Sequence, residues 1–198
     1  MFERQRRDSK YSSEDEADLI RALARGSEDA MATLYDLHGG MIYRFALRMI
    51  QDESIAEEVT QDVFLALLRQ SDRFDPAIGK LSTWLCGIAR RLVWKQLERT
   101  QRLESMDGAE DVPEQSMEDD PASLLTRKEI IMAVQRGIEA LPPDLKEVLV
   151  LCEFEEMKYE DAAIAIGVPI GTIRSRMHRA KQKLATLLRE ESIRSRKP

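Results

Sequence analysis

Residues 159–188 read YEDAAIAIGVPIGTIRSRMHRAKQKLATLL. A short apolar helical pattern at Ala162, Ala163 and Ile166 is followed by a Gly-Val-Pro turn at residues 167–169. A second helical pattern then repeats apolar residues at Ile173, Met177, Ala180 and Leu184. Two helices joined by a tight turn, the second one basic, are typical of a helix-turn-helix, which places its second helix in the major groove of DNA. The stretch therefore predicts a protein that binds duplex DNA.

The second of these helices carries the candidate contacts to duplex DNA. Arginine suits this work because its planar fork binds guanine O6 and N7 together or clamps a phosphate. An ordinary amphipathic helix with a solvated basic face is the alternative, and it would not require the turn and the apolar helix that precede this one. Spacing does not separate base readers from phosphate contacts, although residues near the start of the helix are expected to reach base edges. The candidates are Arg174, Ser175, Arg176, His178, Arg179 and Lys181.

The composition favours an all-α fold. Hydrophobic residues make up 43% of the chain, enough for packed cores, and the few Gly and Pro residues favour helices over sheets. A chain of 198 residues has room for one domain or two small ones. The N-terminal residues are polar, and no apolar run approaches the length that spans a membrane. We therefore expect a cytoplasmic protein without membrane insertion.

Cysteine and histidine residues predict neither a metal site nor a cofactor. Cys86 and Cys152 lie far apart in apolar helical patterns, which favours two reduced core thiols over a disulfide or a metal site. His38 and His178 have no Cys or His neighbours at ligand spacing. No set of residues typical of a catalytic site stands out, so we do not expect an enzyme.

Charge is distributed in blocks, although the formal net charge is −6. Residues 80–102 hold six basic residues and one acidic residue, and residues 170–198 hold nine basic residues and two acidic ones. Between them, residues 103–120 hold eight acidic residues and no basic one. Because the distribution matters more than the sum, this pattern indicates two separate DNA contacts joined by an acidic tether.

The same pattern divides the chain into four parts. Residues 1–16 are expected to form a disordered tail, residues 17–102 a helical domain, residues 103–123 a flexible acidic linker and residues 124–190 a second helical domain. In the second domain, one helix should end at Pro142, and Pro143 is well placed to begin the next.

Helical spacing predicts several elements in the first domain. A short helix should end at Gly26, and helices over residues 30–38 and 41–51 should be separated by Gly39 and Gly40. A helix over residues 54–70 should start with Ser54 as N-cap and Glu57 completing a capping box. Its predicted apolar face includes Ile55, Val59, Val63, Phe64, Leu67 and Leu68. After a loop, Ser82 should begin another helix.

Bases and aromatic residues are mixed in this last helix. Phosphates meeting cations and bases stacking on rings are typical of single-stranded DNA binding. Trp84 and Leu85 fit a core position better, so the candidates are Arg90, Arg91, Trp94 and Lys95. In residues 56–64, acids occupy one face of the helix and apolar residues the other. Periodicity alone does not distinguish this acidic face from an ordinary solvated one.

The ordered set of these motifs closely resembles a bacterial extracytoplasmic function (ECF) sigma factor, over roughly residues 17–190. The matching segments are, in order, LYDLHGGMIYRFALRM, AEEVTQDVFLALL, FDPAIGKLSTWLCGIARR, LPPDLKEVLVL and YEDAAIAIGVPIGTIRSRMHRAKQKL. The resemblance implies a region 2 domain and a region 4 domain joined by the linker. It also implies a subunit that binds core RNA polymerase and directs it to a two-part promoter.

Residue roles follow from this resemblance. It implies that Glu58, Gln61 and Asp62 contact the β′ clamp of the polymerase, and that residues 82–99 melt and capture the −10 strand. It implies that residues 159–184 read the −35 duplex, with the preceding helices near the β flap. The acidic linker is expected to run toward the RNA exit path, and an anti-sigma factor is an expected regulator.

The chain departs from the family pattern at two positions. Members usually have Ile-Ala-Arg-Asn followed by Asp four residues later, whereas Arg91 and Lys95 stand at these positions here. Both changes add positive charge where a flipped base is normally read, so we expect an altered −10 preference.

Two other classes of protein are also consistent with the sequence. A free-standing transcriptional regulator would bind a palindromic operator as a dimer without polymerase. A helical protein-interaction module with an incidental basic helix would show no salt-dependent DNA binding.

Overall fold

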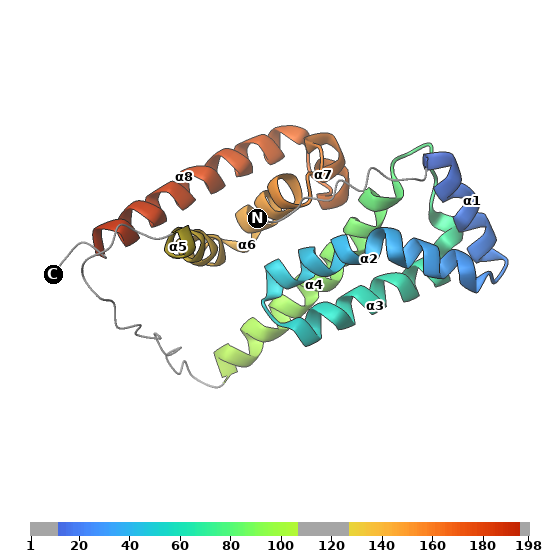
Figure 1. Cartoon of the computed structure of the whole chain (residues 1–198), viewed down its shortest axis with the longest axis horizontal. Coiled ribbons are helices and arrows are strands. Elements are labelled where there is room, and N and C mark those ends of the chain that lie inside the picture. The colour runs from blue at the N-terminus through green and yellow to red at the C-terminus, as the bar shows by residue number, and fades with distance from the viewer. Residues whose placement is uncertain (1–11, 107–126, 195–198) are drawn as a thin grey trace.

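The computed structural model describes residues 12–106 and 127–194, and every regular element in these two ranges is helical. Helices α1–α4 form one group, here called the N-terminal group, and α5–α8 form the C-terminal group (Figure 1). The two groups meet where α2 and α4 pack against α6 and α7. The all-α prediction and the division into two helical units are confirmed for the described residues.

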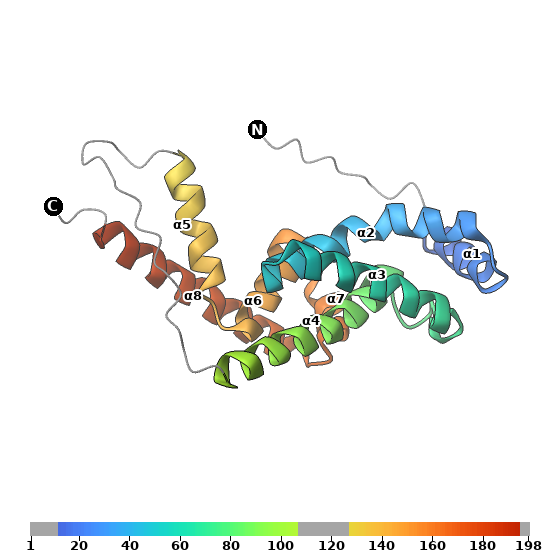
Figure 2. The ribbon, with the colours of Figure 1, turned by 90° about the horizontal axis from the view of Figure 1, so that it is seen from below.

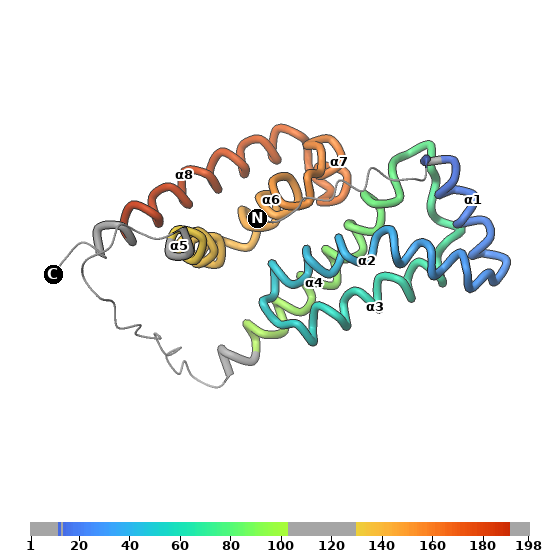
Figure 3. Tube along the Cα trace, viewed as in Figure 1, coloured from blue at the N-terminus to red at the C-terminus, as the bar shows by residue number. Residues whose placement is uncertain are grey.

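The N-terminal group is built around α2 (Glu28–Ile50), α3 (Glu53–Gln70) and α4 (Leu81–Met106), with α1 (Ser13–Ala24) packed on α2. A short 3-10 turn, η1 (Ser71–Arg73), follows α3. The core is apolar and closely packed, and its fully buried side chains include Leu34, Ile42, Phe45, Val63, Leu67 and Leu85. The Cα trace shows α2, α3 and α4 lying along one another (Figure 3).

Helix α1 begins within the stretch that we expected to be a disordered tail. Ser12 is its N-cap: the Ser12 hydroxyl accepts a hydrogen bond from the Asp15 amide at 3.2 Å, and the Ser12 amide donates to the Asp15 carboxylate at 2.7 Å. This reciprocal capping box satisfies amides at the start of the helix, so the tail boundary at residue 16 was wrong. Residues 1–11 lie outside the described part of the chain.

Helix α2 continues through Gly39 and Gly40, so the predicted break there was wrong. Gly39 is buried, and a Cβ atom at this position would lie 3.3 Å from a ring carbon of Tyr35. The small residue lets the Tyr35 ring lie against the helix, and the continuous backbone hydrogen bonding of the long helix outweighs the low helix propensity of glycine.

The start of α3 also differs from the prediction. Asp52 is the N-cap, and its carboxylate accepts a hydrogen bond from the Ile55 amide at 2.9 Å. Ser54 therefore lies inside the first turn, and the capping box of Ser54 with Glu57 was wrong. Leu68 is 48% exposed and does not belong to the buried face, because it lies one residue beyond Leu67 and so is rotated out of the core.

Helix α4 begins at Leu81, one residue before the predicted start, and extends to Met106. Residues 103–106 are therefore helical, although the predicted acidic linker included them. The remaining linker residues and residues 124–126 of the predicted second domain lie outside the described part of the chain.

The C-terminal group contains α5 (Arg127–Glu139), α6 (Pro143–Leu149), α7 (Tyr159–Ile166) and α8 (Ile170–Arg194), with a π-helical turn, η2 (Val150–Phe154), after α6. Pro143 begins α6, as predicted. Figure 2 shows α5 beside α8, and at this crossing a Cβ atom on Gly137 would lie 2.7 Å from Leu184. Cys86 is a buried free thiol in the core, as predicted, whereas the free thiol of Cys152 is only partly buried. Within the two described ranges, no helix is long and apolar enough to cross a membrane.

Candidate nucleic-acid interface

Helices α7 and α8 form the helix-turn-helix that the sequence predicts. Gly167 ends α7 with φ of 76°, a left-handed conformation that glycine adopts without strain. The amides of Gly167 and Val168 both donate to the carbonyl of Ala163, at 2.9 and 3.0 Å. The Thr172 amide then donates to the Pro169 carbonyl at 2.8 Å, which starts α8. The tight turn leaves Ala162 and Ile166 of α7 buried together with Ile173, Met177 and Ala180 of α8.

This packing determines which face of α8 meets solvent. Buried residues recur at Ile173, Met177 and Ala180, so residues about half a turn away point outward. Four of the six predicted duplex contacts are exposed on this outward face: Arg174, Ser175, His178 and Arg179. The face carries two guanidinium groups and begins within the first two turns of the helix, which suits insertion into a major groove.

The other two predicted contacts make ion pairs within the C-terminal group. The Nε atom of Arg176 lies 3.6 Å from a carboxylate oxygen of Asp144 in α6, and the Arg176 side chain is only 21% exposed. The Lys181 amine lies 2.7 Å from Glu153 of η2, and this hydrogen bond raises the pKa of Lys181. Arg176 and Lys181 therefore lie at the edges of the exposed face, where they contact neighbouring elements.

In α4 the four predicted −10 contacts divide into two pairs. Arg91 and Lys95 are exposed to solvent. Arg90 and Trp94 instead face α6, where both contact the carboxylate of Glu147. Trp84 is half-buried against Phe74, and Leu85 is fully buried, in agreement with their predicted core positions. The four contacts therefore do not form one exposed surface in this arrangement of the two groups.

Glu147 is the buried centre of this second cluster. The Trp94 indole Nε1 donates to Oε1 of Glu147 at 2.9 Å, and Nε of Arg90 lies 2.7 Å from the same oxygen. The Arg90 guanidinium also lies over the Trp94 ring, 5.6 Å from its centroid. Burial raises the pKa of Glu147, although the Trp94 hydrogen bond and Arg90 act in the opposite direction. Oε2 of Glu147 is buried without a hydrogen-bond partner among the described residues.

The predicted polymerase contacts lie on one stripe of α3. Glu58, Gln61 and Asp62 are all exposed. Two leucines that the sequence analysis did not assign to this surface extend the same stripe: Leu65 is 44% exposed and Leu68 is 48% exposed. Helical spacing places these leucines on the same face of α3, because they follow Glu58 and Gln61 by seven residues, about two turns.

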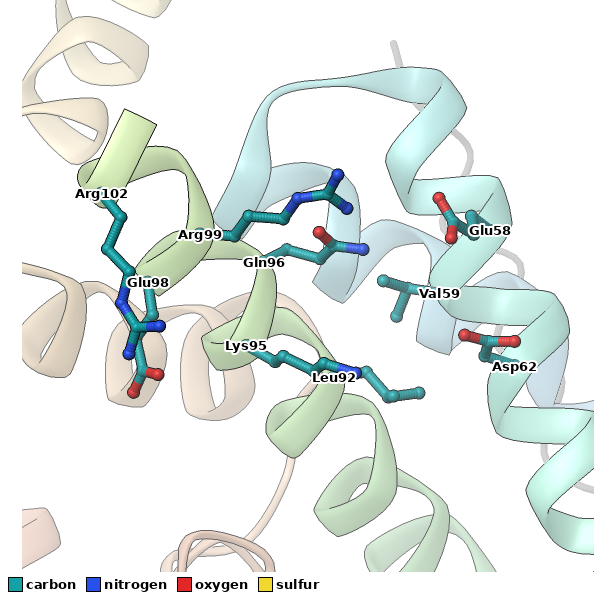
Figure 4. A pocket seen from close by; sticks show the side chains of 9 residues that line it. All are labelled: Glu58, Val59, Asp62, Leu92, Lys95, Gln96, Glu98, Arg99 and Arg102. Carbon is teal, nitrogen blue, oxygen red and sulfur yellow. The ribbon is translucent and has the colours of Figure 1, made fainter. Parts of the chain in front are cut away.

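A cleft of about 510 Å³ separates this stripe from the exposed side of α4. Its α3 wall carries Glu58 and Asp62, and its α4 wall carries Lys95 and Arg99, as Figure 4 shows. The structure thus brings predicted polymerase contacts close to a predicted −10 contact. Among the described residues, no group of three or more His, Cys, Asp or Glu side chains is placed to hold a metal ion.

A helix-turn-helix unit packed on a separate helical unit with a basic helix defines a two-domain, DNA-binding transcription protein. Comparison with known families agrees with this class: residues 34–103 match Sigma-70 region 2, and residues 131–184 match Sigma-70 region 4. The chain is 32% identical over 191 residues to the RNA polymerase sigma-H factor of Pseudomonas aeruginosa, covering 90% of this chain and 98% of that protein. The chain belongs to the ECF RNA polymerase sigma factors.

Further relatives and solved structures are similar over most of the chain. ECF sigma factor SigE of Mycolicibacterium smegmatis is 30% identical over 173 residues, which cover 85% of this chain and 66% of that protein. The sigma factor RpoE of Bartonella quintana, solved with the anti-sigma factor NepR, has a TM-score of 0.62 at 25% identity, covering 80% of this chain and 96% of that one. CnrH, solved with the cytosolic domain of CnrY, has a TM-score of 0.65 at 24% identity, covering 88% and 97%, and supports the fold.

Proposed function

We propose that this sigma factor reads the −35 duplex with α8, captures the −10 strand with α4 and binds core RNA polymerase through α3. The observation that carries the proposal is the exposed face of α8, where Arg174, Ser175, His178 and Arg179 follow a helix-turn-helix turn. A basic face at the start of a recognition helix is suited both to base edges and to phosphates.

The −10 part of the proposal rests on α4. Arg91 and Lys95 present two positive charges to solvent on the same helix as Trp94, whose indole contacts Glu147 of α6 in this arrangement. Cations meet phosphates, and an aromatic ring stacks on an unpaired base, so the set suits a separated strand. Arg90 joins this set when its contact with Glu147 is released.

The polymerase part rests on the stripe of α3. Acidic and amide side chains stand beside two exposed leucines, a combination of polar rim and apolar centre that is common at protein interfaces. We assign Glu58, Gln61, Asp62, Leu65 and Leu68 to the β′ clamp contact, and the helices before α8 to the neighbourhood of the β flap.

The remaining parts of the proposal concern regulation, chemistry and location. A similar sigma factor, RpoE of Bartonella quintana, was solved in complex with an anti-sigma factor, and we propose a regulator of this kind for the present chain. The protein acts in the cytoplasm as a non-catalytic subunit, so the polymerase performs the chemistry.

Run-off transcription with purified core polymerase and a promoter library tests the function. The full-length chain should produce promoter-specific transcripts, and Arg174→Ala should reduce them because it removes an exposed guanidinium from the α8 face. Lys183→Ala is a matched control that removes one charge from the same helix at a position outside the proposed contacts.

Two outcomes would contradict the proposal. Absence of any promoter-specific transcript across the library would exclude a sigma factor. Tight binding of the chain as a dimer to a palindromic operator, without polymerase, would favour a free-standing regulator.

A further inference from the structure

Oppositely charged residues pair across the junction of the N-terminal and C-terminal groups, beside a buried apolar cluster that runs through both groups. The N-terminal group contributes basic residues of α2 and α4 and of the loop before α4, and the C-terminal group contributes acidic residues of α6, α7 and the residue after η2. We call this set the docking interface; it comprises Arg44, Arg48, Lys80 and Arg90 opposite Glu147, Glu155 and Asp161.

Glu155 occupies one end of the docking interface. Its side chain is fully buried, and its two carboxylate oxygens lie 2.7 Å from Arg44 and 2.9 Å from Arg48. The Arg48 guanidinium also lies 4.8 Å from the centroid of the Phe154 ring. Lys80 and Asp161 form a further, more exposed pair at 2.8 Å.

Glu147 and its neighbour Lys146 lie in the middle of the interface. Glu147 contacts Arg90 and Trp94, and the Lys146 amine donates to the carbonyl of Met49 in α2 at 3.4 Å. Lys146 is 6% exposed and Glu147 is 0% exposed, so two consecutive charged residues of α6 are buried by contact with the other group. Charged residues of this kind are almost never fully buried without a partner.

This chemistry suits an interface that opens. Burial lowers the pKa of Lys146 and raises the pKa of Glu147, so both charged forms lose hydration when the groups dock. Removing ion pairs from water costs free energy that their mutual attraction often only just offsets. Interfaces between domains of one chain are more polar than permanent subunit interfaces, and they resemble transient contacts between proteins.

The acidic side of the interface covers residues that the proposed function needs. Arg90 and Trp94 are two of the four −10 contacts, and both are engaged by one carboxylate of α6. A carboxylate is an anion with planar acceptor oxygens, so it occupies the place that a phosphate or a base edge would take on these side chains. A DNA strand and Glu147 cannot contact Arg90 and Trp94 in this way at the same time.

We propose that the docked arrangement is an autoinhibited state, in which Glu147 and Glu155 substitute for nucleic acid on the basic face of the N-terminal group. The two groups must separate before α4 captures the −10 strand. This inference rests on the proposed −10 role of Arg90 and Trp94. It predicts that the free chain is mostly closed and that any change that separates the groups exposes Trp94.

Charge reversal on the acidic side provides the first test. Glu147→Lys combined with Glu155→Lys places like charges against Arg90 and against Arg44 and Arg48, so the groups should separate. The matched control, Glu160→Lys with Glu156→Lys, makes the same change in net charge at two exposed acidic residues outside the docking interface. The chain has two tryptophans, so fluorescence is measured in a Trp84→Phe background, in which the tryptophan emission comes from Trp94.

The interface variant should show a larger radius of gyration by small-angle X-ray scattering and a red-shifted Trp94 emission. It should also bind a −10 single-stranded oligonucleotide about tenfold more tightly than the control variant, if about one molecule in ten of the parent is open. Equal radius, emission and oligonucleotide affinity in the interface and control variants would overturn the inference.

A reversible lock provides the second test. A Cβ atom on Gly87 of α4 would lie 3.9 Å from the Cα atom of Ala165 in α7, so the two backbones lie close together here, which a disulfide between them requires. Gly87→Cys with Ala165→Cys, in a Cys86→Ala, Cys152→Ala background, should therefore hold the groups docked when oxidised. The oxidised protein should fail to bind the −10 oligonucleotide and fail in run-off transcription, and a reducing agent should restore both.

The two proposals fail in different ways. If the reduced protein gives promoter-specific transcripts and the oxidised protein gives as many, the function stands and autoinhibition is excluded. A second outcome is that neither form gives transcripts while the charge-reversal variant still shows the changes in scattering and emission. In that case the two groups do dock through the docking interface, and the proposed sigma function is wrong.

Discussion

Arg91 and Lys95 are the residues at which this chain departs most clearly from the family pattern, and the structure places both side chains in solvent. Neither is among the ion pairs of the docking interface, unlike Arg90 one residue earlier. Their charges therefore remain available to DNA in the docked and the separated arrangement. This supports a direct effect on −10 recognition.

Arg91→Asn should change the −10 preference of the holoenzyme, because it exchanges a cation for an amide that donates and accepts hydrogen bonds. The measurement is selection of active promoters from a library randomised over the −10 element, with Arg102→Asn, outside residues 82–99, as a control for loss of one positive charge on α4. Identical −10 preferences for the parent and Arg91→Asn would refute this role.

Cys86 provides a prediction about pH. Burial, with a smaller contribution from Glu155, raises the pKa of the Cys86 thiol from 9.0 to about 12. Because the folded pKa is raised, the protonated thiol is favoured by folding, and the stabilisation is fully present below pH 9 and is lost as pH rises toward 12. Urea unfolding between pH 8 and pH 11 should show a fall in stability that is smaller in Cys86→Ala. An identical pH dependence in both proteins would count against this assignment.

At the scale of elements, the turn between α7 and α8 depends on one left-handed residue. Gly167 has φ of 76°, whereas Gly171, four residues later, lies inside α8 with open space around it. The two glycines therefore form a matched pair of positions on either side of the turn.

Gly167→Ala should lower the free energy of unfolding by about 1–2 kcal/mol, because a Cβ atom strains the left-handed conformation. Gly171→Ala should leave stability unchanged or raise it by up to about 1 kcal/mol, because alanine has the higher helix propensity. Thermal or urea unfolding measures both. A loss of stability in Gly171→Ala as large as that in Gly167→Ala would show that the left-handed conformation of Gly167 does not cause the loss.

Helix α3 gives a second element-scale prediction. Leu65 and Leu68 are exposed beside Glu58, Gln61 and Asp62. Truncating the two leucines should therefore weaken binding to core polymerase and leave the free energy of unfolding unchanged. The double variant Leu65→Ala, Leu68→Ala should weaken binding to core polymerase by about 1–2 kcal/mol, the scale of partly burying two leucines.

Ile130→Ala in α5 is the control, because it removes an equally exposed apolar side chain from the other group. Competition for core polymerase measures the affinities, and unfolding curves check that the double variant is as stable as the parent. Unchanged affinity in the double variant would remove the leucines from the polymerase contact.

At the scale of the whole molecule, a protein with a formal net charge of −6 concentrates basic residues in α4 and α8, the two helices that we propose face DNA. Acidic residues of the C-terminal group cover part of one of these helices in the docked arrangement. The exposed α8 face, by contrast, remains accessible in both arrangements. Salt should therefore act on promoter binding through the phosphate contacts of α8 and, after opening, of α4.

Promoter affinity of the holoenzyme should fall linearly on a logarithmic plot against salt concentration, because phosphate contacts release counterions. If Arg174 contacts a phosphate, Arg174→Ala should reduce the steepness of that plot by about one unit, whereas Lys183→Ala should leave it unchanged. Equal slopes for all three proteins would show that Arg174 makes no phosphate contact, and a sequence-dependent loss would assign it to base reading.

Local patterns were sufficient for much of this architecture. The helix-turn-helix could be predicted because its signals, an apolar helix, a Gly-Val-Pro turn and a basic amphipathic helix, lie within 30 consecutive residues. Pro143 marked the start of α6 for a similar local reason. The outward position of Arg174, Ser175, His178 and Arg179 follows from helical phase once Ile173 and Met177 are buried.

Other features depended on contacts that local patterns do not contain. The sequence suggests a break at Gly39 and Gly40, but packing of Tyr35 beside Gly39 accompanies a continuous α2. Asp52 competes with Ser54 as the cap of α3, and hydrogen-bond geometry decides between them.

The amino-acid sequence by itself determined the all-α class, the helix-turn-helix and the charge blocks, because helix periodicity, turn chemistry and charge are properties of neighbouring residues. Only the tertiary structure decided that Arg90 and Trp94 meet Glu147, and that Arg44 and Arg48 meet Glu155. These partners are separated by 53 or more positions along the chain. Their pairing depends on how the two folded helical groups pack against each other, and the periodicity of neighbouring residues contains no information about that packing.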